Sequence, residues 1–191
     1  KLTAVWIPGG ADGRQTPPDV QPGEMLEIWR FADSERYFWK TYKNNPTLRR
    51  LEHVVYAYSN LTAFGVKMSA ESSYGYCFST LNKLMSIWTS KSDGEAFKYD
   101  FQFDTKNSKF KVGDDVDNLF AINSNEDEVY LQNSPGSYLK LHEQKMTGYA
   151  SSQVTMLSDG TIELLAPSVN IGGSGGVSTV SQGTVSTKAQ G

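Results

Sequence analysis

Short apolar stretches recur along the second half of the sequence, and turn-forming residues separate them. Each stretch holds two or three apolar positions and is followed by Gly, Asn, Asp or Ser. The stretches are Phe110–Val112, Phe120–Ile122, Val129–Leu131, Leu139–Leu141, Gln153–Met156, Ile162–Leu164, Val169–Ile171 and Val177–Val180. The step between them is about ten residues at first and about eight beyond Val154, which predicts an all-β array of short, regularly repeated strands.

These strands are too short to be stable one at a time. Ordering the backbone costs about 1–2 kcal/mol per residue, and each strand buries only two or three apolar side chains in return. A step of about eight residues supplies about two inward residues, which suits one side of a prism whose other sides come from two more copies. We therefore expect an intertwined homotrimer around a threefold axis. An ordinary antiparallel meander inside one globular domain is the alternative.

The predicted trimer core consists of the inward apolar positions of this array. They are Phe110, Val112, Phe120, Ile122, Leu139, Leu141, Val154, Met156, Ile162, Leu164, Val169 and Ile171.

The first hundred residues contain further strands without a regular step. Breakers at Pro8-Gly9-Gly10 and Asn44-Asn45-Pro46 frame a hairpin predicted from Leu26 to Tyr42. Residues 48–59 could form a helix or a strand, and the β-branched and aromatic run Val54–Tyr58 favours a strand. The alternating stretch Phe97–Phe103 predicts a strand with one buried face. Together these stretches predict a compact barrel or sheet of about five or six strands.

The composition changes after Leu164, because Lys188 is the only charged residue beyond it. This part is rich in Gly, Ser and Thr, as a flexible linker would be. Its valines and isoleucines nevertheless keep the strand rhythm, and its glycines fall at the turns. We therefore expect an ordered, narrow structure in which small residues permit close approach near the axis.

The overall charge and the single cysteine limit the possible classes. The formal net charge is −3, which gives no general attraction to nucleic acid or to anionic membranes. Cys77 is the only cysteine, so no disulfide can form within the chain, and assembly in a reducing compartment is expected. No run of about 18 apolar residues is present that could span a bilayer as a helix.

Several segments together resemble the central spike of contractile-tailed phage baseplates, and the related spike of type VI secretion systems. Trp6-Ile-Pro-Gly9, Pro22-Gly-Glu24 and the hairpin are similar to the oligonucleotide/oligosaccharide-binding (OB) barrel of that family. The array from Lys111-Val-Gly-Asp-Asp115 through Gly136–Leu141 to the eight-residue steps is similar to its triple-stranded β-helix. The resemblance implies an OB-like barrel over residues 1–104, followed by a homotrimeric triple-stranded β-helix over residues 105–191.

The same resemblance implies a structural protein of the phage virion, made in the host cytoplasm, that pierces the host envelope on sheath contraction. Its expected partners are two further copies, tail hub proteins at the barrel end and a separate tip protein at the other end. Three departures from the family pattern matter. Phe103 leads almost directly into the array and leaves no room for a lysozyme domain. No histidine follows His142, so a His-x-His iron tip is missing, and the Val-x-Gly repeat is fragmentary.

Other chemistry has weaker support in the sequence, and we expect no enzyme activity, no cofactor, no metal and no nucleic acid. The two histidines, His53 and His142, give no metal-ligand spacing, although one His per chain could meet two others on a threefold axis. Bases alternate with aromatic residues from Arg36 to Lys40, as in single-strand binders. An OB-type module that binds glycan or single-stranded nucleic acid on a trimeric stalk is the main alternative function. A cell-wall hydrolase is the weakest.

Overall fold

The computed structural model describes residues 3–8, 13–43, 45–49, 51–61 and 67–186. All regular elements within these ranges are β-strands, and they form two sheets of three and nine strands. The chain divides into two compact units, Lys1–Gln153 and Val154–Gly191. The all-β prediction is therefore confirmed. Both sheets belong to the first unit.

The three-stranded sheet contains β1 (Ala4–Trp6), β2 (Leu26–Arg30) and β3 (Tyr37–Thr41), with β3 in the middle. The predicted hairpin is confirmed as β2 and β3, which pair antiparallel, whereas β1 runs parallel to β3. The strands of the described residues before position 105 do not close into one barrel. Instead, β1 to β3 form one sheet and the next strands belong to the other, so the OB-like barrel is not shown.

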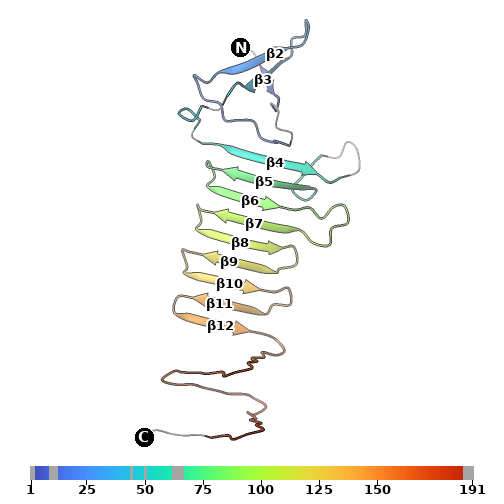
Figure 1. Ribbon diagram of the computed structural model, residues 1–191. Coiled ribbons are helices and arrows are strands. Elements are labelled where there is room, and N and C mark those ends of the chain that lie inside the picture. The colour runs from blue at the N-terminus through green and yellow to red at the C-terminus, as the bar shows by residue number, and fades with distance from the viewer. Residues whose placement is uncertain (1–2, 9–12, 44, 50, 62–66, 187–191) are drawn as a thin grey trace. The chain divides into compact units, whose positions relative to one another are not determined.

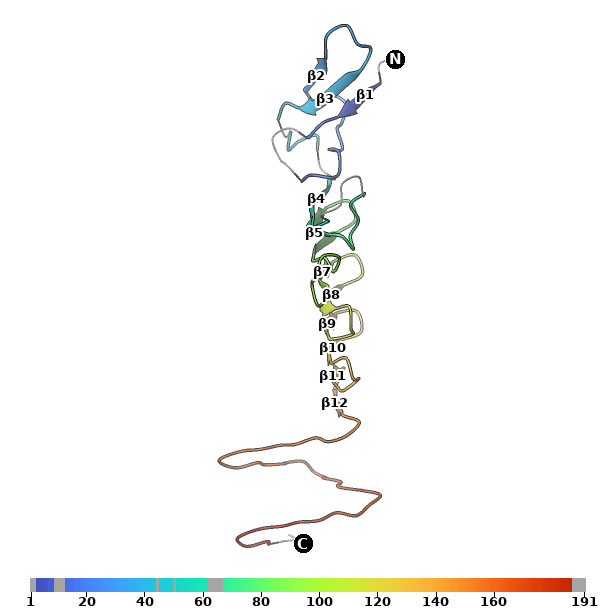
Figure 2. The same cartoon turned by 90° about the vertical axis from the view of Figure 1, so that its right-hand side faces the viewer.

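The nine-stranded sheet is an antiparallel meander in which each strand pairs with the next one along the chain (Figure 1). Figure 2 views this sheet along its strands and shows one layer. Its strands are β4 (His53–Ser59), β5 (Ser73–Ser79), β6 (Leu84–Trp88), β7 (Tyr99–Asp104), β8 (Lys109–Asp114), β9 (Leu119–Asn123), β10 (Glu128–Gln132), β11 (Tyr138–His142) and β12 (Lys145–Tyr149).

Short turns join the later strands and keep their spacing regular. The turn between β8 and β9 is held by the Asp114 carboxylate, which accepts hydrogen bonds from the backbone N–H of Val116 at 3.0 Å and of Asn118 at 2.9 Å. Asp117 in the same turn has a φ of 68°, a region that Asp tolerates better than most residues. Gly136 adopts a φ of 87° in the turn before β11, where a side chain would be strained.

The predicted strands of the array fall into two groups. Those around Phe110, Phe120, Val129 and Leu139 are confirmed as parts of β8 to β11, and the extended reading of Val54–Tyr58 is confirmed as β4. Strand β12 was not predicted. The connectivity of β4 to β12 is that of the antiparallel meander, the alternative to the β-helix, and the sheet runs unbroken through the domain boundary expected at residues 104 and 105.

The second unit contains the remaining predicted strands, from Gln153–Met156 to Val177–Val180. Within its described residues, 154–186, the chain alone forms no strand and makes no sheet pairing. Its apolar side chains are exposed, with Leu157 at 89% and Val180 at 92%. An isolated chain therefore offers this segment neither a partner strand nor a core.

Candidate assembly interface

The register of the nine-stranded sheet gathers its apolar side chains on one face. Residues directly opposite each other in an antiparallel pair project to the same side, so pairs can be followed from strand to strand. One row crosses all nine strands without a polar residue. It consists of Val54, Phe78, Met85, Phe103, Phe110, Ile122, Val129, Leu141 and Met146.

A second row runs beside the first on the same side of the sheet. It consists of Tyr56, Tyr76, Ile87, Phe101, Val112, Phe120, Leu131 and Leu139, and it ends at Gly148 on β12. We call the two rows together the apolar face. No charged side chain belongs to either row. The period-two alternation of each strand therefore produces a surface of uniform character over the whole sheet.

The opposite side of the later strands is polar. Its residues include Asp104, Lys109, Asn123, Glu128, His142 and Lys145 in one row, and Gln102, Lys111, Tyr130, Lys140 and Thr147 in the next. An ion pair joins Lys140 to Glu128, and the Tyr138 and Tyr149 rings stack with centroids 5.5 Å apart. This side is suited to contact with water, so the two sides of the sheet differ sharply.

Within one chain the apolar face lacks a cover. Ile87 is 56% exposed, Leu131 53% and Met146 73%. Among the described residues the only buried apolar ones are Ala57 and Cys77. The chain exposes 15208 Å² in total, whereas a compact monomer of 21.2 kDa exposes about 9,000 Å². Apolar exposure on this scale marks an interaction surface.

Aromatic side chains stiffen the middle of the apolar face. The Phe103 and Phe110 ring centroids lie 4.8 Å apart, and Phe101 meets Phe110 edge to face at 5.4 Å. Phe110 also contacts Phe120 edge to face at 5.9 Å. Such pairs contribute about 0.5–1.5 kcal/mol each beyond area burial. The face is therefore ordered before any partner covers it.

The structure brings together half of the predicted core residues. Phe110, Val112, Phe120, Ile122, Leu139 and Leu141 all lie on the apolar face. The other six lie in the second unit, where the chain alone does not bring them into a sheet. They are Val154, Met156, Ile162, Leu164, Val169 and Ile171, and all of them are exposed.

Sequence reasoning missed how far the apolar face extends. It placed β4 to β7 in a separate barrel, although Met85 and Phe103 belong to the same row as Phe110. The alternation of Phe101 and Phe103 was the available signal, because it matches that of β8. Met146 was missed together with β12.

No group of three or more metal-ligating side chains gathers in the described parts of the chain. His142 lies on the polar side, opposite Glu128 and Lys145, so it does not project toward the apolar face. Cys77 Sγ lies 3.8 Å from His53 Nδ1, but burial raises the pKa of this thiol. A raised pKa disfavours the thiolate that nucleophilic catalysis requires.

The basic and aromatic hairpin uses several of its charges internally. Lys40 Nζ lies 2.9 Å from Glu27 and 5.0 Å from the centre of the Trp29 ring. Arg49 bonds to Glu24 with both side chains almost fully buried. Arg50, part of the same sequence pattern, lies outside the described residues. These pairings leave fewer cations for a nucleic-acid backbone than the sequence suggested.

Within the described residues, no helix has the length and apolar character to cross a membrane. A comparison of the sequence with models of known protein families and with curated proteins finds no match. The function is therefore argued from the apolar face and from the second unit.

Proposed function

We propose that three copies of this chain assemble through their apolar faces into a trimeric spike. In this assembly, the three sheets form the sides of a prism and the polar sides face the solvent. The observation that carries the proposal is the pair of unbroken apolar rows, which cross nine strands and have no cover in one chain.

The second unit supports three copies rather than two. Its apolar residues recur in pairs at a step of about eight, as in Ile162 and Leu164, and two residues fill only one side of a three-sided core. Its backbone finds no strand partner within one chain, and backbone groups buried in an assembly must be paired. Strands from two other copies would supply these partners. The triple-stranded β-helix is therefore proposed for residues beyond about 153, after a meander that each chain forms alone.

A structural, piercing role fits such an assembly. A spike driven through an envelope must resist buckling and unfolding, and an intertwined trimer has paired strand edges and entangled chains. The sequence resemblance to contractile-tail spikes points the same way. We propose a virion protein without enzyme activity, with hub proteins at the N-terminal end, a separate tip protein at the C-terminal end and transient contact with the host envelope.

The test is the solution mass of the whole chain, measured by light scattering and combined with SDS gels of unboiled and boiled samples. We expect three times 21.2 kDa and a band that dissociates only on boiling. A mass of twice 21.2 kDa would replace the prism by two sheets packed face to face. A monomer at micromolar concentration would overturn the proposal.

A further inference from the structure

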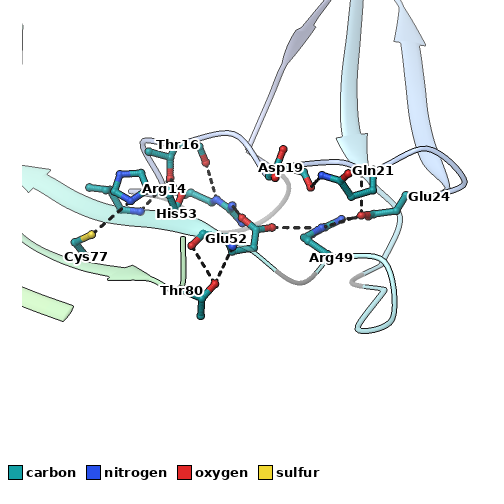
Figure 3. A network of polar contacts seen from close by, with 11 residues as sticks. Arg14, Thr16, Asp19, Gln21, Glu24, Arg49, Glu52, His53, Cys77 and Thr80 are labelled. Atoms are coloured by element: carbon teal, nitrogen blue, oxygen red, sulfur yellow. Dashed lines mark hydrogen bonds and ion pairs between the residues drawn. The ribbon is translucent and has the colours of Figure 1, made fainter. Parts of the chain in front are cut away.

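A chain of four charged side chains lies between the three-stranded sheet and the nine-stranded sheet (Figure 3). Guanidinium and carboxylate groups alternate along it in the order Arg14, Glu52, Arg49, Glu24. Arg14 Nη2 lies 3.4 Å from Glu52 Oε2, and Arg49 Nε lies 3.3 Å from Glu52 Oε1 and 3.3 Å from Glu24 Oε1. A second contact joins Arg49 Nη2 to Glu24 Oε2. We call these four side chains the ion chain.

The two ends of the ion chain belong to different sheets. Glu24 lies directly before β2, and its carboxylate also accepts the backbone N–H of Gln21 at 3.2 Å. At the other end, Arg14 belongs to a short segment that pairs with the edge of β4. There Gln15 donates its N–H to the Val55 carbonyl at 2.8 Å, and Ala57 donates to the Gly13 carbonyl at 2.8 Å.

The middle of the ion chain lies in the connection from β3 to β4. The Asn45 carbonyl accepts the Arg49 N–H at 2.9 Å, which fixes the turn that carries Arg49. Glu52 donates its N–H to Thr80 Oγ1 at 2.9 Å, just beyond β5. The connection is therefore held at two points, one toward each sheet.

Burial makes these contacts stronger than ordinary surface ion pairs. The side chains of Arg49 and Glu24 are 5% and 1% exposed, and those of Arg14 and Glu52 are 16% and 19% exposed. Exposed pairs contribute about 0–1 kcal/mol, whereas loss of one partner from a buried pair leaves an uncompensated charge. The two positive and two negative groups balance, so no net charge is buried.

We propose that the ion chain is a joint that fixes the three-stranded sheet to the edge of the nine-stranded sheet, so that the two sheets move together. The joint belongs to one chain and does not depend on the trimer. Opening it would leave each sheet folded but would free β1 to β3 to move against β4.

Hydrogen exchange on the full-length chain tests the joint, with Arg49→Met as the variant. We expect exchange in β2 and β3 to become about tenfold faster or more, while exchange in β5 to β12 stays unchanged. Lys140→Met is the matched control, because it removes the Lys140–Glu128 pair from the polar side of the long sheet. It should leave β2 and β3 as they are in the wild type.

Two results would overturn the joint. Unchanged exchange in β2 and β3 would show that the ion chain holds nothing, and equal acceleration in both sheets would show general stabilisation instead. If Arg49→Met does not fold, Glu24→Gln, which keeps the size and an accepting oxygen, is measured against the same two criteria. The solution mass is independent of this result, so failure of the joint and failure of the trimer are distinguishable.

Discussion

At the scale of single residues, the character of a position depends on which side of the sheet it occupies. Leu141 and Thr147 are close in sequence and lie on neighbouring strands, but Leu141 belongs to the apolar face and Thr147 to the polar side. In the proposed trimer, Leu141→Asp would place three carboxylates in one buried layer, at a cost of several kcal/mol per ion. We expect this variant to be monomeric by light scattering, and Ile162→Asp in the second unit to weaken assembly in the same way.

Thr147→Asp is the control for Leu141→Asp, because it adds the same charge on the side that faces water. It should remain trimeric. An intact, heat-resistant trimer of Leu141→Asp would show that the apolar face is not the core.

The acid response of the ion chain also belongs to the residue scale. The pKa of Glu24 lies below its ordinary value of 4.5, chiefly because the Arg49 side chain donates hydrogen bonds to it. A lowered pKa in the folded state means that the stabilisation is present above the ordinary pKa and is lost as pH falls through the lowered one. We expect exchange in β2 and β3 to stay slow down to about pH 4.5 and to accelerate only at lower pH.

The comparison with Glu24→Gln isolates this residue, since other carboxyl groups with lowered pKa values, such as Asp114, respond in the same direction. The variant should lose the part of the pH dependence that is confined to β2 and β3. An identical pH profile in the wild type and in Glu24→Gln would contradict the assignment.

At the scale of elements, close packing within the sheet limits which side chains its strands accept. A Cβ on Gly75 of β5 would lie 2.4 Å from the Trp88 ring and 2.7 Å from the Tyr56 carbonyl oxygen, which cannot move without disturbing β4. We expect Gly75→Ala to lower the free energy of unfolding by about 1–3 kcal/mol. Thermal unfolding measures the effect. Gly148→Ala is the control within one chain, because no atom lies within 4 Å of its Cβ position.

How far the sequence could predict the elements depends on whether the signal was local. Alternation and turn residues identified β8 to β11, and both are properties of neighbouring positions. Strand β12 escaped because Lys145, Thr147 and Gly148 carry little β-propensity, and only its pairing with β11 reveals it. The contact of Arg49 with Glu24 spans 25 residues, and no periodicity encodes such a pair. The separate barrel was wrongly extended to β7 because sequence alone cannot show which sheet a strand joins.

At the scale of the whole molecule, one chain leaves two needs unmet, which are a cover for the apolar face and strand partners for residues 154–186. A threefold assembly meets both, so the two should be gained and lost together. In that case the second unit gains its order only on assembly, as segments that fold on binding do.

Limited proteolysis with a protease of broad specificity tests this coupling. We expect residues 154–186 to resist cleavage in the wild-type trimer and to be removed rapidly from Leu141→Asp, although that substitution lies outside the second unit. Cleavage follows the population of the unpaired state, so the expected difference is large, at least about a hundredfold in rate. Rapid removal of the same segment from a wild-type sample of confirmed trimeric mass would separate the two needs. The apolar face would then be sufficient for assembly, and the second unit would have to obtain its strand partners from a different protein.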